Sequence, residues 1–216
     1  MIKACIFDLD GVIVDTAKYH FIAWRKLANE LGFDFTEKEN EKLKGVSRMG
    51  SLNLILEWGG IKMEEDKKVE WATKKNEWYK EHILDMGEEE ILPGVRQFLN
   101  ELKAKNIQYA LGSASKNAAA VMNKIGLTEE FVTIIDGTKT TKGKPDPQVF
   151  QMGAEAMGVQ AEECIVFEDA AKGVQAALNG NFYAVGVGSP ESLGAAHMVI
   201  SGFEGLTFDQ VLQGIQ

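Results

Sequence analysis

The chain is poor in cysteine and has no long apolar segment. Its 216 residues include two cysteines, Cys5 and Cys164, and both lie in short apolar runs, so we expect reduced, buried packing residues there. No run approaches the ~20 apolar residues that a membrane-spanning helix needs, and the first residues lack the pattern of a signal peptide. We therefore expect a cytoplasmic protein without a membrane partner.

Basic residues are also in short supply. The chain has 23 Lys and Arg against 32 Asp and Glu, which gives a net charge of −9. A nucleic-acid interface needs a basic patch, so this balance argues against a nucleic-acid partner. It is compatible with a small anionic substrate, because a few lysines and arginines can reverse the electrostatic field inside one cleft.

After the turn at Leu92-Pro93-Gly94, the chain alternates regularly between helical and strand-like segments. This alternation is typical of a parallel sheet. We therefore predict an α/β fold with a Rossmann-like parallel sheet core and helices on both faces of the sheet. The predicted strands are residues 3–8, 107–112, 131–135, 164–167, 182–187 and 197–200, and the predicted helices of this part are 94–105, 116–125, 147–157, 170–179 and a terminal helix.

Residues 16–88 differ, because they contain helical patterns without a strand. We predict that they form an all-α helical cap domain, inserted into a core domain of residues 1–15 and 89–216. Asp15 or Thr16 is expected to cap the first cap helix. Apolar residues at helical spacing predict the buried faces of the first and last cap helices. These residues are Phe21, Trp24, Ala28 and Leu31 in the first helix, and Val69, Ala72, Tyr79 and Ile83 in the last.

Two carboxylates, Asp8 and Asp10, follow the first predicted strand and precede Gly11. Side chains two residues apart on a strand point to the same face, so these carboxylates would repel each other without a counter-ion. Hard divalent cations take oxygen ligands. Because ligands of open α/β sheets bind at the carboxyl ends of the strands, this pair indicates a metal site at that edge.

Further polar residues follow the other predicted strands. Ser113 and Ser115 come after the strand 107–112, Glu168 and Asp169 follow the strand 164–167, and Lys144 lies in the loop before helix 147–157. Taken singly, the serines could be helix N-caps, the acids could favour a helix N-terminus, and the lysine could lie in a surface turn. Their repeated occurrence at strand ends indicates one edge that binds a metal and a phosphate together.

These residues resemble the four motifs of the haloacid dehalogenase superfamily of phosphoryl-transfer enzymes. The motifs are Asp8-Leu9-Asp10-Gly11, Ser113, Lys144-Pro145 and Glu168-Asp169. Among the nearby lysines Lys139, Lys142 and Lys144, the last is the one followed by proline, as the motif requires. Within the superfamily, further strings up to about residue 188 are similar to the β-phosphoglucomutase family. They are Tyr19-His20, Trp24, Lys44-Gly45-Val46-Ser47-Arg48, Ser51, Lys75-Asn76 and Ser113-Ala114-Ser115-Lys116-Asn117.

The resemblance implies a role for each matching residue. Asp8 would be the nucleophile that forms an aspartyl phosphate, and Asp10 would be the general acid and base. One Mg²⁺ would be held by the Asp8 side chain, the Asp10 backbone carbonyl, Glu168 and Asp169. The implied substrate contacts are His20, Trp24, Gly45, Val46, Ser47, Arg48, Ser51, Lys75, Ser113, Ala114, Ser115, Lys116, Asn117 and Lys144.

The implied activity is an isomerase reaction that interconverts β-D-glucose 1-phosphate and D-glucose 6-phosphate through the 1,6-bisphosphate. We expect a monomer that acts on small sugar phosphates. A sugar-phosphate phosphatase with water as the acceptor shares the same core motifs and is the main alternative. A phospho-receiver module would lack the long helical insertion, a non-catalytic sensor would be expected to have lost an acid, and a dehalogenase would not need Asp10 or the metal acids.

Overall fold

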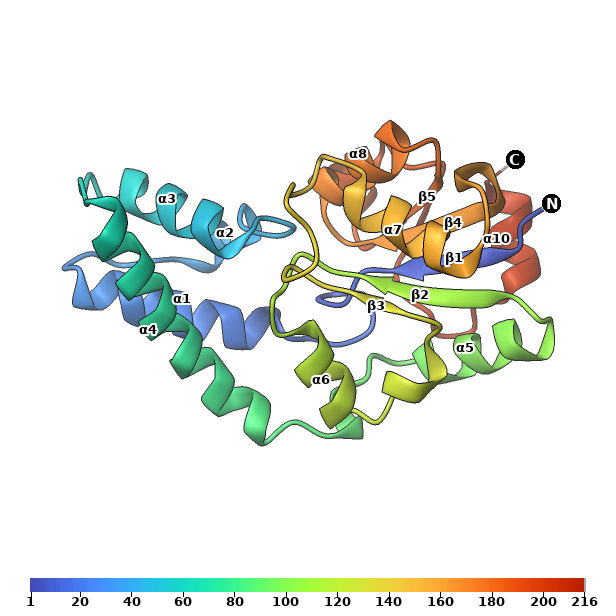
Figure 1. Ribbon diagram of the computed structural model, residues 1–216, viewed down its shortest axis with the longest axis horizontal. Coiled ribbons are helices and arrows are strands. Elements are labelled where there is room, and N and C mark those ends of the chain that lie inside the picture. Colours follow the sequence, from blue (N-terminus) through green and yellow to red (C-terminus); the bar gives the residue numbers. More distant parts are fainter. Residues whose placement is uncertain (216) are drawn as a thin grey trace.

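The computed structural model describes residues 1–215, and within them a six-stranded parallel sheet forms the centre of the larger of two lobes (Figure 1). The strand order is β3-β2-β1-β4-β5-β6, with every neighbouring pair parallel. The predicted α/β fold class is therefore confirmed. The strands are β1 (Ala4–Phe7), β2 (Gln108–Gly112), β3 (Ile134–Ile135), β4 (Cys164–Glu168), β5 (Tyr183–Val187) and β6 (Met198–Ile200).

The central strand β1 fixes where the polar strand ends meet. All four of its residues are fully buried, as expected for a strand covered on both faces. Phe7 pairs with Leu111 on one side and with Phe167 on the other. The residues that follow β1, β2 and β4 therefore begin at the same level of one edge. The strand order turns back at β1, and this is the point where open α/β sheets bind ligands.

Helices cover both faces of the sheet. The buried residues of α5 (Val95–Ala104), α6 (Ala118–Lys124) and α10 (Phe208–Gly214) share one hydrophobic cluster with one face of the strands. Those of α7 (Gln148–Met157), α8 (Ala171–Asn179) and the short α9 (Pro190–Leu193) share a second cluster with the other face. The sequence patterns did not predict α9, and the strand predicted at residues 131–135 is reduced to β3.

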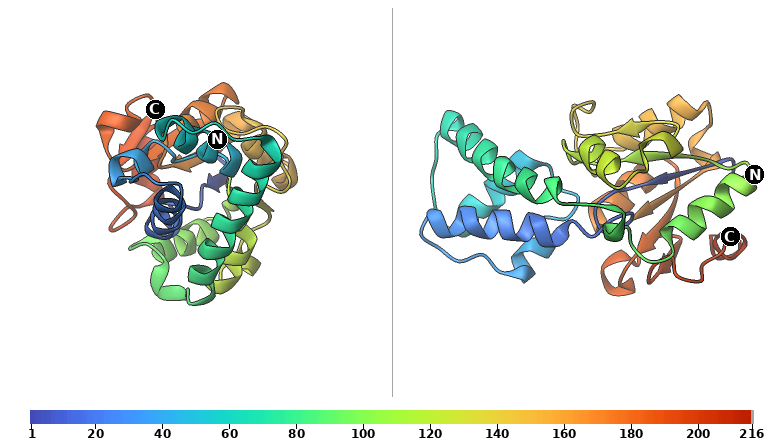
Figure 2. Two further views of the ribbon diagram at one scale, coloured as in Figure 1. Left: turned by 90° about the vertical axis from the view of Figure 1, so that its left-hand side faces the viewer. Right: turned by 90° about the horizontal axis from the view of Figure 1, so that it is seen from below.

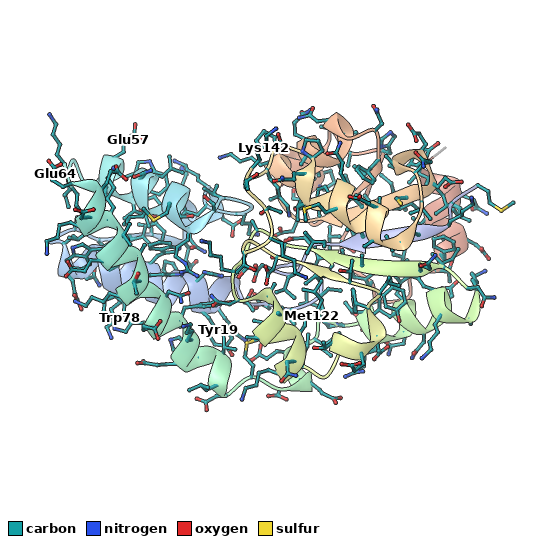
Figure 3. All side chains as sticks on the ribbon, viewed as in Figure 1. Tyr19, Glu57, Glu64, Trp78, Met122 and Lys142 are labelled. Atoms are coloured by element: carbon teal, nitrogen blue, oxygen red, sulfur yellow. The ribbon has the colours of Figure 1, made fainter. Side chains whose placement is uncertain are left out.

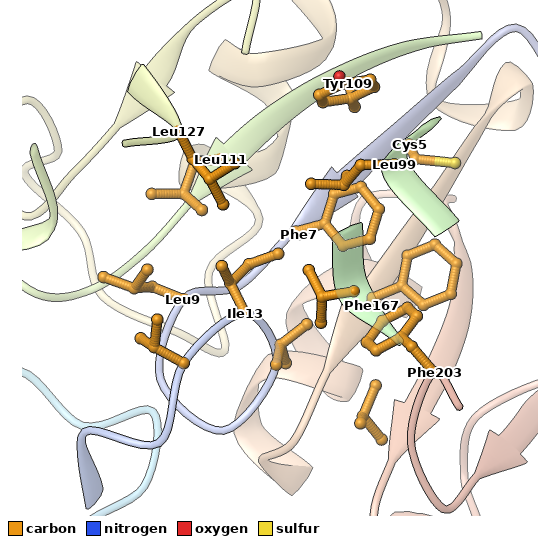
Figure 4. Close-up of a cluster of buried hydrophobic side chains, with 14 of the residues drawn as sticks. Cys5, Phe7, Leu9, Ile13, Leu99, Tyr109, Leu111, Leu127, Phe167 and Phe203 are labelled. Atoms are coloured by element: carbon orange, nitrogen blue, oxygen red, sulfur yellow. The ribbon is translucent and has the colours of Figure 1, made fainter. Parts of the chain in front are cut away.

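Aromatic rings hold β1 and β4 together just below the polar edge (Figure 4). The rings of Phe7 and Phe167 stack with centroids 4.8 Å apart and planes 6° apart. Phe203 packs against Phe167 with centroids 5.4 Å apart. Stacked, fully buried rings of this kind are large contributors to core packing. They fix the strand pair directly before Asp8 and Glu168.

The smaller lobe is formed by four helices between β1 and α5 (Figures 1 and 2). They are α1 (Ala17–Glu30), α2 (Glu37–Glu41), α3 (Arg48–Trp58) and α4 (Glu65–Leu84). They bury a hydrophobic cluster of their own, which includes Trp24, Leu27, Phe35, Leu52 and Ile55. The chain termini lie at the far end of the larger lobe (Figure 2).

Two connecting segments join the lobes. Val14 forms isolated bridges with Asp10 and Ile91, and the Leu92 amide donates to the Ile13 carbonyl at 2.9 Å. Tyr19, labelled in Figure 3, lies at this junction and donates a hydrogen bond to Glu90 at 2.5 Å. Across residues 1–215, no helix combines the length and the apolar character needed to cross a membrane.

Of two predictions about the helices of the smaller lobe, the N-cap of α1 was right in position only, and the buried face of α4 was partly wrong. Thr16 occupies the N-cap position of α1 but makes no capping bond, because its hydroxyl donates instead to the Asp10 carboxylate. Val69 was predicted on the buried face of α4, yet it is 55% exposed. Its side chain lines a cavity shared with the loop that carries Lys142, and this loop faces the smaller lobe (Figure 3).

Candidate active site

A cleft between the two lobes brings together most of the residues that the sequence singled out. Both lobes contribute to its lining. The predicted residues that line it are Asp8, Asp10, His20, Trp24, Gly45, Val46, Arg48, Ser51, Lys75, Ser113, Ala114, Ser115, Lys116, Asn117 and Asp169. Ser47 and Lys144 line an adjoining cavity that shares Arg48 and Lys116 with the cleft, and Glu168 is fully buried beside Lys144.

Three carboxylates crowd the floor of the cleft. One carboxylate oxygen from each of Asp8, Glu168 and Asp169 lies within 4.8 Å of the others. Burial, followed by the neighbouring carboxylates, raises the pKa of Asp169 to about 7. Burial also raises the pKa of Glu168 to about 8, against the opposing effect of Lys144. An oxygen-only donor set with excess negative charge is what a hard divalent cation requires, so these residues fit a metal ion.

Two glycines make room for this carboxylate cluster. Gly11 has a φ of +77°, and a Cβ atom there would overlap the Asp169 carboxylate. Gly173, in α8, would place a Cβ atom inside the Glu168 carboxyl group. Any side chain at either position would therefore displace one of the acids. The close approach of the Asp169 carboxylate thus explains why a glycine, Gly11, follows Asp10 in the sequence.

Lys144 neutralises part of the cluster from within the core. Its ammonium donates to Asp8 Oδ1 at 2.9 Å and to Glu168, and it lies 5.0 Å from the centre of the Phe150 ring. Burial opposes the charged form of Lys144, but the two carboxylates outweigh it and raise the pKa of the lysine above its usual range. The lysine therefore stays protonated beside Asp8.

The loop after β2 is organised by its own serines. Ser113 Oγ accepts from the Ser115 amide at 3.1 Å, and Ser115 Oγ accepts from the Asn117 amide at 3.2 Å. Each serine uses its oxygen as an acceptor here, which leaves its O–H available to donate to a ligand. The Asn117 side chain donates to Asn76 Oδ1 in α4 at 2.9 Å, a buried bond between the lobes.

Asp10 lies between the carboxylate cluster and the smaller lobe. Its carboxylate accepts a hydrogen bond from Thr16. Burial, and then the Asp8 carboxylate, raises the pKa of Asp10 to about 6. A carboxyl group in this range can both hold and release a proton near neutral pH, as general acid–base chemistry requires.

His20 and Lys75 form a pair on the smaller lobe. Lys75 Nζ lies 2.9 Å from His20 Nδ1 and 4.3 Å from the centre of the Trp24 ring. Burial, and then neighbouring positive charge, lowers the pKa values of both residues well below their usual ranges. The contact is consistent with an Nζ–H donating to a neutral imidazole nitrogen.

The loop before α3 brings the smaller lobe onto the core. Gly45 has a φ of +68°, and a Cβ atom there would approach the Ala170 Cβ to 3.1 Å, so glycine permits this close contact. Ser47 is the N-cap of α3 and accepts from the Gly50 amide at 3.3 Å. This cap places Arg48 at the first position of the helix, where it lines the cleft.

Several lining residues were not predicted as site residues. Lys44 forms an ion pair with Asp169 at 3.3 Å, and Asn76 bonds Asn117. Both belong to strings that carried the family resemblance, so their place in those strings was the available signal. The other lining residues without a predicted role are Ala17, Asn40 and Leu43. Nothing in their local sequence distinguishes them from packing or surface residues.

Comparisons with known proteins agree with this geometry. The family model described as haloacid dehalogenase-like hydrolase matches residues 2–181. The chain belongs to this family. It is 39% identical over 209 residues to the β-phosphoglucomutase of Bacillus subtilis, a match that covers 96% of this chain and 92% of the relative.

Two further relatives show the range of named activities. A crystal structure of β-phosphoglucomutase from Clostridium difficile superposes with a TM-score of 0.95 at 44% identity, covering 100% of this chain and 97% of that one. The phosphorylated carbohydrates phosphatase of Thermotoga maritima is 33% identical over 182 residues, covering 81% of this chain and 80% of the relative.

Proposed function

We propose that this protein is a β-phosphoglucomutase. It interconverts β-D-glucose 1-phosphate and D-glucose 6-phosphate through an aspartyl-phosphate enzyme and glucose 1,6-bisphosphate. The observation that carries the proposal is one cleft lined by Asp8 and Asp169 of the carboxylate cluster and also by a second group, the cations Arg48 and Lys116. A bisphosphate intermediate carries two phosphates and needs both groups, one for each phosphate. The relatives named β-phosphoglucomutase support the same activity.

In this proposal, the lobes are two domains. Residues 1–15 and 89–216 form the core, and residues 16–88 form a helical cap over its active edge. The cap excludes water when a sugar phosphate is bound, which favours transfer to a sugar hydroxyl over hydrolysis. We also propose a cytoplasmic monomer that acts on small sugar phosphates, in keeping with the net charge of −9.

Asp8 is the proposed nucleophile. Its carboxylate attacks the transferring phosphorus to give an aspartyl phosphate, and the bond from phosphorus to the sugar oxygen breaks. Mg²⁺, held by Asp8, the Asp10 carbonyl, Glu168 and Asp169, would supply neutralisation of the negative charge that gathers there. Lys144, the Ser113 hydroxyl and the Ala114 amide hold the phosphoryl oxygens. Positioning of these groups supplies most of the rate enhancement.

Asp10 is the proposed general acid and base. In its protonated form it donates to the leaving oxygen, and in its ionised form it takes the proton from the acceptor hydroxyl. The raised pKa of about 6 supports both roles. His20 and Lys75 lie beside it on the cap and couple sugar binding to the position of its carboxyl group.

The distal phosphate site combines cap and core residues. Arg48 offers a planar guanidinium that suits phosphate oxygens, and Ser115, Lys116 and Asn117 line the same cleft. Between the two phosphate sites, the sugar ring contacts Trp24 and the loop before α3. The remaining proposed contacts are Gly45, Val46, Ser47 and Ser51.

Hydrolysis by water is the second candidate function. The similarity to the Thermotoga maritima phosphatase favours it, because that relative also covers most of this chain. The core residues serve both reactions equally. The acceptor is decided by how well the cap and the distal site hold a sugar hydroxyl over the aspartyl phosphate.

An assay with β- and α-glucose 1-phosphate, coupled to detection of glucose 6-phosphate, tests the proposal. We expect turnover of the β anomer, stimulated by glucose 1,6-bisphosphate as primer, and far less turnover of the α anomer. Release of inorganic phosphate, measured in parallel, should be the slower reaction. No β-selective isomerisation, with or without primer, would contradict the proposal.

A further inference from the structure

A second cavity adjoins the cleft and is lined by the loop that carries Lys142 (Figure 3). Its volume of about 440 Å³ lies in the range of small-molecule sites. Both lobes line it, through α3 and α4 of the smaller lobe and the loops after β2 and β3 of the larger. Residues that line this cavity but not the cleft include Val69, Thr73, Thr140, Thr141 and Lys142. It is therefore a space of its own, although it shares Arg48 and Lys116 with the cleft.

The charge around this cavity has one sign. Its basic lining residues are Arg48, Lys116, Lys142 and Lys144. None of its lining residues within 1–215 is acidic, whereas aspartates line the cleft. Lys144 is already paired inside the core, and Lys142 meets Asp146 in a solvent-open ion pair of 3.3 Å that contributes little. We call Arg48, Lys116 and Lys142 the cavity cations. In a chain of net charge −9, they make this cavity a local site of positive potential.

The smaller lobe gives the same cavity an apolar wall. The wall consists of Met49 in α3 and Val69 and Ala72 in α4. Val69 is 55% exposed, so its side chain is open to a ligand. Cations bind phosphate oxygens, and an apolar wall packs against an apolar or aromatic group. The combination suits a phosphate ester whose other end is a flat, weakly polar ring, as in a nucleoside phosphate.

The loop that carries Lys142 is fixed before any ligand binds. Gln148 Oε1, at the start of α7, accepts from the Thr141 and Lys142 amides at 2.9 and 2.8 Å. A Cβ atom at Gly137 would overlap the Ala114 carbonyl oxygen, so glycine lets the loops after β2 and β3 meet. A pre-formed loop lowers the cost of ordering on binding. The cavity is therefore shaped by the fold itself.

We propose that this cavity is a second ligand site, which binds a nucleoside phosphate. The phosphate lies at the cavity cations, and the base packs on the apolar wall. Arg48 and Lys116 also belong to the proposed distal phosphate site, so a ligand in the cavity competes with the sugar phosphate for them. The binding site goes beyond the proposed function, and only this competition rests on it.

Calorimetric titration of the full-length protein with AMP, in the presence of Mg²⁺, tests the binding. We expect saturable binding with a Kd below about 1 mM. Adenosine lacks the phosphate and inorganic phosphate lacks the base, so each should bind at least about tenfold more weakly than AMP. Absence of saturable AMP binding would overturn the inference. Equal affinity for AMP and either of the other two probes would overturn it as well.

Two variants place the AMP in the cavity rather than in the cleft. Val69→Asp adds a negative charge to the apolar wall, and Lys142→Met removes a cation. Both side chains are largely exposed and neither lines the cleft, so kcat and KM without AMP should stay within twofold of wild type. Each variant should weaken AMP binding about tenfold, as expected for one contact to a charged group.

Lys139→Met is the matched control. Lys139 lies on the same loop, does not line the cavity, and donates to the Ile134 carbonyl at 2.6 Å. Its AMP affinity should stay within twofold of wild type. Unchanged AMP affinity in both Val69→Asp and Lys142→Met would place the nucleotide elsewhere and overturn the inference, as would an equal loss in Lys139→Met.

Failure of this inference is distinguishable from failure of the proposed function. The titrations do not depend on turnover, so they remain decisive if the protein hydrolyses β-glucose 1-phosphate without isomerising it. The competition is measured separately. AMP at ten times its Kd should raise the apparent KM for the sugar phosphate about tenfold, in isomerisation or in phosphate release. An unchanged KM would overturn the shared use of Arg48 and Lys116.

Discussion

The two halves of the cleft carry opposite excess charge. On the core floor, Asp8, Glu168 and Asp169 lie within 4.8 Å of one another, and burial raises the pKa values of the last two. On the cap side, burial and neighbouring positive charge lower the pKa values of His20 and Lys75. Each half is thus unfavourable on its own and is relieved by a ligand of the opposite charge.

This contrast explains how one cleft can bind a divalent cation and a phosphorylated sugar. The core half is already partly neutralised by Lys144, which bridges Asp8 and Glu168. On the cap side, the Arg48 guanidinium lines the cleft. The core is therefore suited to catalysis and the cap to recognition. Four predictions test this division, in order of decreasing expected effect.

Removing the nucleophile should abolish the chemistry of the core half. Asp8→Asn should lower turnover by about 10⁴-fold or more and prevent formation of a phosphoenzyme, because an amide cannot replace the attacking carboxylate. Rapid-quench detection of labelled enzyme measures this directly. Asp136→Asn is a matched control, because Asp136 is buried after β3 and its side chain bonds to Thr138; it should form the phosphoenzyme normally. Full activity in Asp8→Asn would refute the assignment.

Removing the internal counter-charge should destabilise the metal-free protein. Lys144→Met leaves Asp8 and Glu168 buried without their partner, and breaking a buried pair of this kind costs about 3–5 kcal/mol of unfolding free energy. Urea unfolding in the presence of a chelator measures the loss.

Magnesium should restore more stability to Lys144→Met than to the wild type, since the variant site is more negative. Lys142→Met is the control. Its ion pair with Asp146 is exposed and should contribute less than about 1 kcal/mol. Equal stability of Lys144→Met and wild type without metal would contradict the charge balance described for the core.

Removing the Arg48 guanidinium should affect the reactions of the two halves of the cleft to different extents. Arg48→Ala should lower isomerisation about 10- to 100-fold, the range for a hydrogen bond to a charged group. Formation of the aspartyl phosphate from a small donor such as acetyl phosphate should change less than about threefold, because that step uses the core. Arg25→Ala, which removes a surface ion pair with Asp34, should leave both rates unchanged. Equal losses in both assays would show that the halves do not act separately.

The smallest effect concerns the dependence of stability on pH. Because the pKa of His20 is lowered in the folded state, the unfolded state binds its proton first as the pH falls. The stability that neutral His20 contributes is thus present above its unfolded-state pKa near 6.5. It is lost as the pH falls below that pKa, at up to about 1.4 kcal/mol per pH unit. The raised pKa values of Asp10, Glu168 and Asp169 act in the opposite direction.

The difference in unfolding free energy between wild type and His20→Asn isolates this effect. When both proteins are measured from pH 7.5 to 5, the wild type should steadily lose unfolding free energy relative to His20→Asn below about pH 6.5. A difference that stays constant with pH would show that His20 is protonated equally in the folded and unfolded states.

The strand ends were predictable from the sequence because local pattern and chemistry coincide there. Buried parallel strands appear as short apolar runs, and residues such as Asp8 and Ser113 directly follow them. The parallel register then places them at one edge. The all-helical segment at residues 16–88 was predictable for a similar reason, because its apolar residues recur at helical spacing.

Pairings across the tertiary structure could not be predicted in the same way. His20 and Lys75 are 55 residues apart and meet because α1 packs against α4. Thr16 looked like a helix cap, but a buried carboxylate competes for its hydroxyl. Val69 fits the helical period of α4, yet that part of the helix faces a cavity rather than a core. In each case, a partner distant in sequence decides the outcome.

The most direct test of the central claim is the fate of the aspartyl phosphate in a single turnover. Enzyme phosphorylated on Asp8 is mixed either with buffer or with glucose 6-phosphate, and products are separated after rapid quenching. The account predicts that glucose 6-phosphate removes the phosphoryl group at least about 100-fold faster than water, and that the product is glucose 1,6-bisphosphate. Release of inorganic phosphate at the same rate with and without the sugar would contradict it.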